Sequence, residues 1–334
     1  MIKISSNANF HQVTAGSVFD IRGEEAFKEY RWRWNYNPQN FAVDSFPIHL
    51  DIESTSACNL KCPFCATTSQ HWGPSQSGLM DMGLYRKIID EGAENGLCAI
   101  KLSLRGEPLI HKQVHEMVRY AKEKGVLDVY FNTNGMLLTE EVSRRLIEAG
   151  LDRISISFEG IEKARYESYR PGAVFEAVIA NVRRLLALRK EIGASHPQVR
   201  VQTVLLPELK AGFDRYVDFW KNEVGADEVS YLDAREEGPQ YDHRGKVAGW
   251  ACPFLWQRMT ILWDGTILPC LMHGLDDFSL MTLGNAKTDS SKELWRGVRE
   301  SDIRGLHRQG AAHKLEACDR CSYRAMEVTK LKRI

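Results

Sequence analysis

Three cysteines in one short stretch carry the most specific chemistry in the sequence. Cys58, Cys62 and Cys65 are spaced C-x3-C-x2-C and directly follow an apolar run, residues 47–52, that predicts a strand. Three thiolates on one loop can hold three irons of a cubane iron–sulfur cluster and leave the fourth iron open, whereas structural clusters have four cysteine ligands. An open metal position is typical of a catalytic site. The alternative is a zinc knuckle, but zinc ribbons favour paired C-x2-C units and no fourth ligand lies nearby.

A second set of four cysteines lies nearer the end of the sequence. Cys252 and Cys270 enclose two apolar runs joined by an Asp-Gly pair at 264–265, a strong hairpin signal, so the two thiols can meet. Cys318 and Cys321 add a C-x2-C pair. Four thiolates can saturate a [4Fe–4S] cluster, and they also suit structural zinc.

Strands and helices alternate from residue 47 onward and must position these cysteines. Apolar runs predict six strands, at 48–54, 99–104, 128–132, 153–158, 198–206 and 228–232. Helical periodicity predicts five helices between them, at 82–94, 111–124, 139–149, 173–191 and 213–224. Six strands with five crossover helices predict an α/β fold with a parallel sheet.

The flanks of this alternation differ from it in composition. Residues 1–45 are rich in aromatic and charged side chains and predict a helix and a loop that cover the bottom or side of the next domain. The alternation stops near residue 238. We therefore expect an N-terminal extension at 1–45, a core domain at 46–237 and a cluster domain at 238–334. Cys98 begins the second strand, and we expect it to be a buried core thiol.

The cysteine triplet resembles the cluster motif of the radical S-adenosylmethionine (radical SAM) superfamily. The resemblance implies a partial (β/α)6 TIM-like barrel with the first cysteine loop at the carboxyl rim, where barrel active sites lie. In that family the open iron binds the amino and carboxylate groups of S-adenosylmethionine, and an electron from the cluster generates a 5′-deoxyadenosyl radical. Phe64 occupies the aromatic position of the motif and is expected near the adenine.

Further segments resemble the cofactor-binding segments of the same family. Residues 104–108 resemble its G-G-E-P segment, with Arg105 in place of the first glycine; a helix cap is the alternative role for its glutamate. Residues 132–135, 155–160 and 169–172 resemble its T-N-G, S-I-D-G and I-R-G segments. The resemblance implies that these residues contact the cofactor: Gly106, Glu107, Asn132, Asn134, Ser157, Arg170 and, on the fifth strand, Gln202. For Arg170, a surface arginine is the alternative.

The four later cysteines resemble the twitch form of the SPASM extension, which implies a small C-terminal domain with a β-hairpin and a helix. The cofactors implied are thus two [4Fe–4S] clusters and S-adenosylmethionine. A saturated auxiliary cluster has no iron free for substrate and is suited to accepting an electron from it. The family also implies a flavodoxin- or ferredoxin-type electron donor.

Charged residues close the sixth strand: Asp233, Arg235 and Glu236. The segment resembles that of twitch-domain aminocyclitol dehydrogenases, which implies hydrogen bonds and a base for a hydroxylated ring; the alternative is a solvated linker. We expect a secondary alcohol of a sugar, nucleotide sugar or aminocyclitol to be oxidised. Epimerisation is the second hypothesis, and modification of a peptide or protein, as in sulfatase maturation or thioether formation, is the third. A metal-binding scaffold is the non-enzyme hypothesis.

Composition excludes several classes of function. Lys plus Arg and Asp plus Glu both number 44, so the basic excess of nucleic-acid-binding proteins is absent. No apolar stretch approaches the ~20 residues of a transmembrane helix, and no secretory apolar region opens the sequence. We therefore expect a cytoplasmic protein with neither nucleic-acid nor membrane partners, where eight cysteines indicate metal ligands rather than disulfides.

Overall fold

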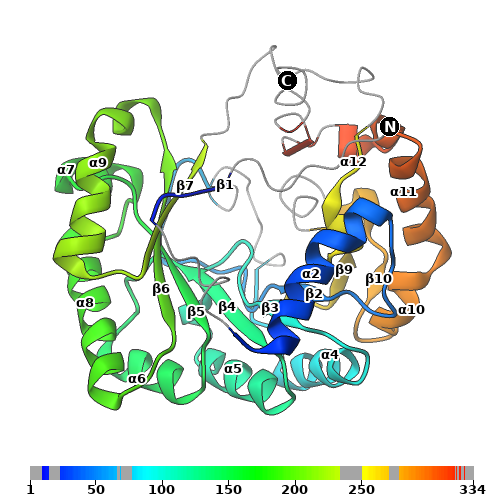
Figure 1. Cartoon of the computed structure of the whole chain (residues 1–334), viewed down its shortest axis with the longest axis horizontal. Coiled ribbons are helices and arrows are strands. Elements are labelled where there is room, and N and C mark those ends of the chain that lie inside the picture. Colours follow the sequence, from blue (N-terminus) through cyan, green and yellow to red (C-terminus); the bar gives the residue numbers. More distant parts are fainter. Residues whose placement is uncertain are drawn as a thin grey trace.

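The structure is a computed structural model that describes residues 10–14, 23–65, 68, 77–233, 250–270, 278–319, 321, 323, 324 and 327. One curved, ten-stranded sheet runs through it in the order β1-β7-β6-β5-β4-β3-β2-β8-β9-β10. Helices cover the outer, convex face of this sheet (Figure 1). The two edge strands, β1 and β10, are not paired with each other, so the barrel is not closed.

Six neighbouring parallel strands form the core of the sheet, as the sequence predicts. They are β2 (His49–Ile52), β3 (Ala99–Lys101), β4 (Asp128–Thr133), β5 (Arg153–Ser157), β6 (Gln198–Leu205) and β7 (Glu228–Asp233). The crossover helices are α4 (Met82–Glu94), α5 (Val114–Glu123), α6 (Glu140–Glu148), α8 (Phe175–Ile192) and α9 (Phe213–Asp218). The last predicted helix continues as a π-helical turn, η4 (Phe219–Val224). A further helix, α7 (Lys163–Tyr169), lies in a segment where the sequence predicted none.

Local signals explain where these helices begin and end. The Asp81 carboxylate accepts a hydrogen bond from the backbone N–H of Leu84 and caps α4. The Thr139 hydroxyl does the same for α6, whose first turn carries two glutamates. Helix α8 ends at Gly193, which has a left-handed φ of 73°. Short 3₁₀ segments follow several strands or precede the cluster elements: η2 (Pro108–Ile110), η3 (Pro207–Gly212), η6 (Pro253–Trp256), η8 (Phe278–Met281) and η9 (Ala312–Lys314).

The two faces of the parallel strands differ in chemistry, because successive side chains on a strand point to opposite sides. Ile100, Val129 and Val201 belong to the apolar core shared with the outer helices. The residues that alternate with them, such as Lys101 and Tyr130, face the barrel interior. A polar interior is therefore built into the strand sequences.

The C-terminal segment continues the barrel sheet rather than forming a separate one. Strand β8 (Arg258–Ile261) pairs in parallel with β2, and the predicted hairpin joins it to β9 (Thr266–Leu268). Gly265, at the hairpin turn, has a φ of 91°, which favours glycine. Strand β10 (Gly284–Asn285) completes this edge. Helices α10 (Ser291–Arg296), α11 (Val298–Arg308) and α12 (Glu316–Asp319) follow.

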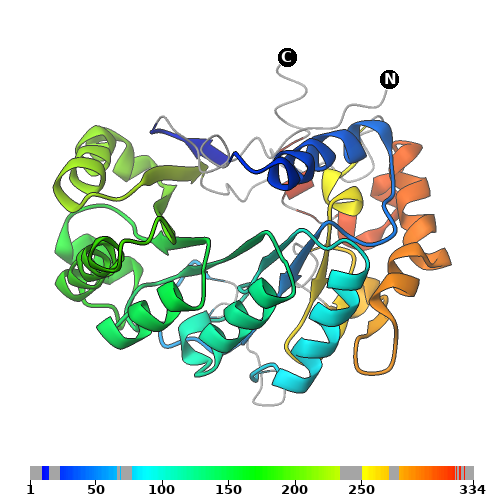
Figure 2. The same ribbon diagram turned by 60° about the horizontal axis from the view of Figure 1, so that its bottom comes forward.

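The N-terminal helix α2 (Glu25–Asn40) closes the amino-terminal end of the barrel interior. Its Phe27 and Tyr30 pack with Ile48, Cys98 and Ala99 at the starts of the first strands. Helix α2 lies on the opposite side of the sheet from the crossover helices (Figure 2). Strand β1 (Phe10–Gln12) pairs antiparallel with β7. Among the described residues, none of the helices is both long and apolar enough to span a membrane.

The docking of α2 gives a stability prediction. Phe27 is fully buried, whereas Trp32 on the same helix is 57% exposed. Phe27→Ala should lower the free energy of unfolding by about 3–5 kcal/mol, because it removes buried apolar surface and leaves a cavity. Trp32→Ala, the matched control, should change it by less than about 0.5 kcal/mol. Denaturant unfolding of both variants measures the difference; equal effects would contradict this docking.

Candidate functional site

The loop after β2 gathers the first three cysteines at one wall of a cavity of about 250 Å³. The backbone N–H of Leu60 points to Cys58 Sγ at 3.5 Å, and the N–H of Cys65 donates to the carbonyl of Cys62. Burial raises the pKa of Cys62 to about 11, with the other two thiols contributing. Thiols with raised pKa values are stabilised as thiolates by binding a metal, because metal binding displaces their protons.

Gly106 allows a close backbone approach beneath this loop. A Cβ atom built on Gly106 would lie 2.3 Å from the carbonyl oxygen of Thr55 and 2.6 Å from that of Ala57. The next residue, Glu107, donates its backbone N–H to the Ala57 carbonyl at 2.8 Å. Only glycine fits this contact, so the end of β3 and the start of the cysteine loop are held together.

The Glu107 carboxylate joins two neighbouring loops. It accepts hydrogen bonds from Leu109 N at 3.1 Å, Thr133 Oγ1 at 2.6 Å and Asn134 N at 2.7 Å. The first of these is the cap of η2 that the sequence allowed as an alternative. Burial raises the pKa of Glu107, although the three hydrogen bonds oppose this shift. Three of about four acceptor positions are used, so one remains for a further donor.

Two other contacts hold the cysteine loop from the opposite side. Asn134 donates from Nδ2 to Asn59 Oδ1 at 2.9 Å, and Lys61 N donates to the Pro171 carbonyl at 3.2 Å. Gly172 has a φ of 96° and lies against Leu60. Asn59 was not singled out by the sequence reasoning, because its partner lies 75 residues away.

Arg170 lies at the cavity and is buried rather than at the surface. Its guanidinium binds the Glu159 carboxylate through Nε and through Nη2, the latter at 2.7 Å. Burial opposes ionisation, but Glu159 raises the pKa of Arg170. One edge of the guanidinium is therefore already occupied by a carboxylate of the protein. Its charge also lies over the ring of Phe64, 5.8 Å from the centroid.

Most of the residues predicted to contact the cofactor line this one cavity, together with the three cysteines. They are Phe64, Gly106, Glu107, Asn132, Asn134, Ser157 and Arg170. Gln202 does not line it, and its Nε2 points to Ser230 Oγ at 3.4 Å. The Oδ1 atom of Asn132 is buried without a hydrogen-bond partner in the described part of the chain. A cavity with three thiols and an unpaired acceptor fits a polar ligand next to a cluster.

Asp233 is the one predicted substrate residue that the structure describes, and it does not line the cavity. Asp233 ends β7 and its carboxylate pairs with His11 on β1 at 3.0 Å. Tyr231, two residues earlier and so on the same face, stacks on the His11 ring and contacts Phe213 of α9. This is the helix-covered face, not the barrel interior. Arg235 and Glu236 lie outside the described residues.

The four later cysteines lie together in a separate packed group around the start of β8. Cys252, Cys270, Cys318 and Cys321 pack with Trp250, Phe254, Tyr323 and neighbouring apolar residues. Burial raises the pKa of Cys252, and the other three thiols of the set raise it further. No three His, Cys, Asp or Glu side chains of the described segments are spaced to hold a single metal ion.

His307 links two of these cysteines, a contact the sequence did not indicate. Its Nδ1 accepts from the Cys252 backbone N–H at 3.1 Å, and its Nε2 lies 3.4 Å from Cys318 Sγ. Burial lowers the pKa of His307 to about 3, so the imidazole is neutral. Because Nδ1 is an acceptor, the single proton resides on Nε2 and points to the sulfur. Such hydrogen bonds to ligating sulfurs tune cluster potentials.

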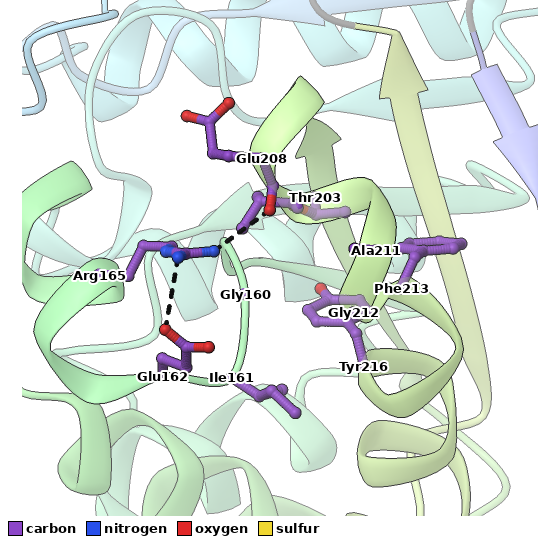
Figure 3. Close-up of a pocket in the computed structure, with 11 residues that line it drawn as sticks. Gly160, Ile161, Glu162, Arg165, Thr203, Glu208, Ala211, Gly212, Phe213 and Tyr216 are labelled. Carbon is purple, nitrogen blue, oxygen red and sulfur yellow. Dashed lines mark hydrogen bonds and ion pairs between the residues drawn. The ribbon is translucent and has the colours of Figure 1, made fainter.

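A second cavity of about 280 Å³ lies between α7 and α9. Arg165 pairs with Glu162 at 3.6 Å and donates to the Glu208 carbonyl (Figure 3). The Glu208 carboxylate accepts a hydrogen bond from the Tyr169 hydroxyl. Thr203 lines it from β6, on the strand face opposite to Gln202. This cavity is therefore outside the barrel interior and separate from the cysteines.

Comparison with known proteins identifies the class. Residues 52–213 match the family model of the radical SAM superfamily, and residues 252–322 match an iron–sulfur cluster-binding domain of the SPASM type. The chain belongs to the radical SAM superfamily and carries a SPASM-type domain. It is a radical SAM enzyme. Its cofactors are S-adenosylmethionine, a [4Fe–4S] cluster and an additional iron–sulfur cluster bound by the SPASM-type domain.

Particular relatives share different parts of the chain. The tungsten-containing aldehyde ferredoxin oxidoreductase cofactor-modifying protein of Pyrococcus furiosus is 26% identical over 83% of this chain and 87% of its own length. The AdoMet-dependent heme synthase of Methanosarcina barkeri is 36% identical, but over only 42% of this chain and 40% of its own length. The GTP 3′,8-cyclase of Chlorobaculum tepidum is 35% identical over a similar share, 42% and 41%.

Solved structures share the fold. BtrN in complex with AdoMet and 2-DOIA aligns over 84% of this chain and 94% of its own, with a TM-score of 0.55 and 18% identity. Streptococcus suis SuiB bound to the precursor peptide SuiA aligns over 88% and 76%, with a TM-score of 0.54 and 15% identity. These likenesses establish the architecture of barrel and cluster domain.

The contact at Gly106 gives a prediction for the cysteine loop. Gly106→Ala should cost about 1–3 kcal/mol of stability, because the added methyl group meets backbone atoms that cannot rotate away. It should also lower iron retention and the cleavage of S-adenosylmethionine. Gly305→Ala is the matched control, since a Cβ there meets nothing within 4 Å. Wild-type stability and cleavage in Gly106→Ala would argue against this role.

Metal analysis tests the two groups of cysteines. After anaerobic reconstitution we expect about eight irons and eight sulfides per chain, as two [4Fe–4S] clusters require. The triple variant with alanine at Cys58, Cys62 and Cys65 should keep about four of each, because the second group is untouched. Stoichiometric zinc without sulfide would refute the assignment of both groups.

Proposed function

We propose that the protein oxidises a secondary alcohol of a small hydroxylated substrate to a ketone, with the substrate bound in the barrel interior beside the first cysteine loop. The observation that carries this proposal is the polar cavity that joins the cysteine loop to the barrel interior. Cys58, Cys62 and Cys65 would hold the first cluster, and Cys252, Cys270, Cys318 and Cys321 the auxiliary one. When bound, the cofactors supply the 5′-deoxyadenosyl radical and an acceptor for one electron.

Residues of the cavity would orient S-adenosylmethionine between the cluster and the substrate. Asn132 has the unpaired acceptor, and Glu107 has one acceptor position left, so both suit an amino group or hydroxyls. Ser157 adds a hydroxyl from the end of β5. The exposed ring of Phe64 suits stacking on the adenine. Arg170 would act mainly by holding Glu159 and the loop wall.

The chemistry balances as a two-electron oxidation. When bound, the cofactors would accept one hydrogen atom from the substrate carbon and one electron, and a base of the chain would accept the hydroxyl proton, so that the substrate would lose two protons and two electrons. Four cysteines gathered in one apolar group support this role, because a cluster with four protein ligands has no iron left to bind substrate. Asp233 faces the helices rather than the barrel interior, so Glu236, in the charged segment that follows it, is our candidate for the base.

Modification of a cofactor is the second candidate function. The Pyrococcus furiosus relative matches along most of both chains, and it is named as the cofactor-modifying protein of a tungsten-containing aldehyde ferredoxin oxidoreductase. Such a substrate would also be a small molecule held in the barrel interior. A radical acting on it need not remove two hydrogens, so the mass of the product separates the two candidates.

Product analysis tests the oxidation. With a compound that stimulates 5′-deoxyadenosine formation, we expect a carbonyl product lighter by two hydrogen atoms and transfer of deuterium from the reacting carbon to 5′-deoxyadenosine. Cys98→Ser is the control and should retain turnover, because Cys98 is buried beneath α2. A product of unchanged mass that takes deuterium from heavy water, with turnover lost in Cys98→Ser, would instead establish epimerisation.

A further inference from the structure

Lys101 projects into the barrel interior from the last position of β3. Its neighbours Ile100 and Leu102 are fully buried in the core shared with the outer helices. Alternation along the strand therefore turns Lys101 to the inner face. There it lines the same cavity as the three cysteines, together with Asn132 and Ser157. The ammonium thus faces the space that S-adenosylmethionine and substrate would share.

The carboxylates around Lys101 already have arginine partners. Four carboxylates of the barrel interior, three on strands and Glu53 directly after β2, are each paired with one arginine. The pairs are Asp51 with Arg258 at 3.2 Å, Glu53 with Arg105 at 2.6 Å, Asp128 with Arg153 at 2.6 Å and Glu228 with Arg200 at 3.6 Å. Glu107, at the cavity rim, uses its carboxylate in three hydrogen bonds to neutral donors.

Among the described residues of the barrel interior, Lys101 is a cation that these ion pairs do not include. Within the described residues its ammonium forms neither a hydrogen bond nor an ion pair. Burial lowers the pKa of Lys101; Asp51 opposes this, while Arg258, Arg200 and Arg153 lower the pKa further. A partly buried charge without a partner costs free energy. A protein keeps such a destabilising residue at a site where a bound ligand supplies the missing partner.

We propose that Lys101 binds an anionic group of the substrate, a carboxylate or a phosphate ester, at the floor of the cavity. The inference deepens the proposed function and depends on its placing the substrate in the barrel interior. Among hydroxylated substrates, an anion site at Lys101 would favour uronates, sugar phosphates and nucleotide sugars. An amino-substituted ring would instead bring a second cation toward Lys101, which is unfavourable.

The test compares the reconstituted holoenzyme with its Lys101→Met variant. Uronates, sugar phosphates and nucleotide sugars are assayed beside uncharged sugars and aminocyclitols, and stimulation of 5′-deoxyadenosine formation above the rate without substrate is measured. Only the anionic compounds should stimulate. Lys101→Met should raise their KM roughly tenfold or more. Lys190→Met, on the outer helix α8, is the matched control and should change neither this KM nor the unstimulated rate.

Folding and direct binding complete the test. Lys101→Met should have an unchanged or higher Tm, because it removes an unpaired charge at similar volume. If no compound stimulates, calorimetry with inorganic phosphate and pyrophosphate on the S-adenosylmethionine-loaded holoenzyme should show binding that Lys101→Met lacks.

Four results would overturn the proposal. These are stimulation by uncharged or amino compounds equally in both proteins, a lower unstimulated rate in Lys101→Met, a lower Tm, or no binding of either anion when no compound stimulates. A lower unstimulated rate would assign Lys101 to S-adenosylmethionine instead. Because the readouts are stimulation and binding, they are independent of whether the product is a ketone, so failure of the oxidation proposal would be seen separately.

Discussion

The pairing of buried charges inside the barrel is the constraint on which the rest of the structure depends. Carboxylates taken out of water cost several kcal/mol each unless a cation and hydrogen bonds compensate them. Asp51 shows the result: burial opposes its ionisation, yet Arg258 and His49 hold its pKa well below the usual range. A polar ligand can therefore enter the interior without meeting an apolar wall, whereas most barrels fill this space with aliphatic side chains.

The cysteine loop depends on contacts with three segments, two that follow strands and one that follows a helix. Gly106, after β3, touches its backbone, Asn134, after β4, holds Asn59, and the segment at 171–172, after α7, packs on it. None of these contacts involves a cysteine. The loop is consequently positioned by the barrel itself, which is how a scaffold pre-organises ligands before a cofactor arrives.

The second cysteine group is coupled to the first through one continuous sheet. Strand β8 pairs with β2, the strand that leads into the first cysteine loop. Helix α2 is tied to the same region, since Gln257 donates to the Trp34 carbonyl at 2.7 Å and Phe41 contacts Trp256. Shared hydrogen bonds leave little freedom for the two sites to move apart.

The sequence by itself determined the parts of this protein that local patterns encode. Cysteine spacing predicted two groups of thiols, which the structure gathers. Periodicity with caps predicted the six parallel strands and their crossover helices, because each signal lies within a few residues. The tertiary structure alone decided the partners of charged side chains. Arg170 turned out to be buried against Glu159, Asp233 turned to His11 on the helix-covered face, and β8 joined β2. These outcomes depend on which distant segments meet, and a charged residue has the same local pattern whether its partner is a cofactor, a neighbouring strand or water.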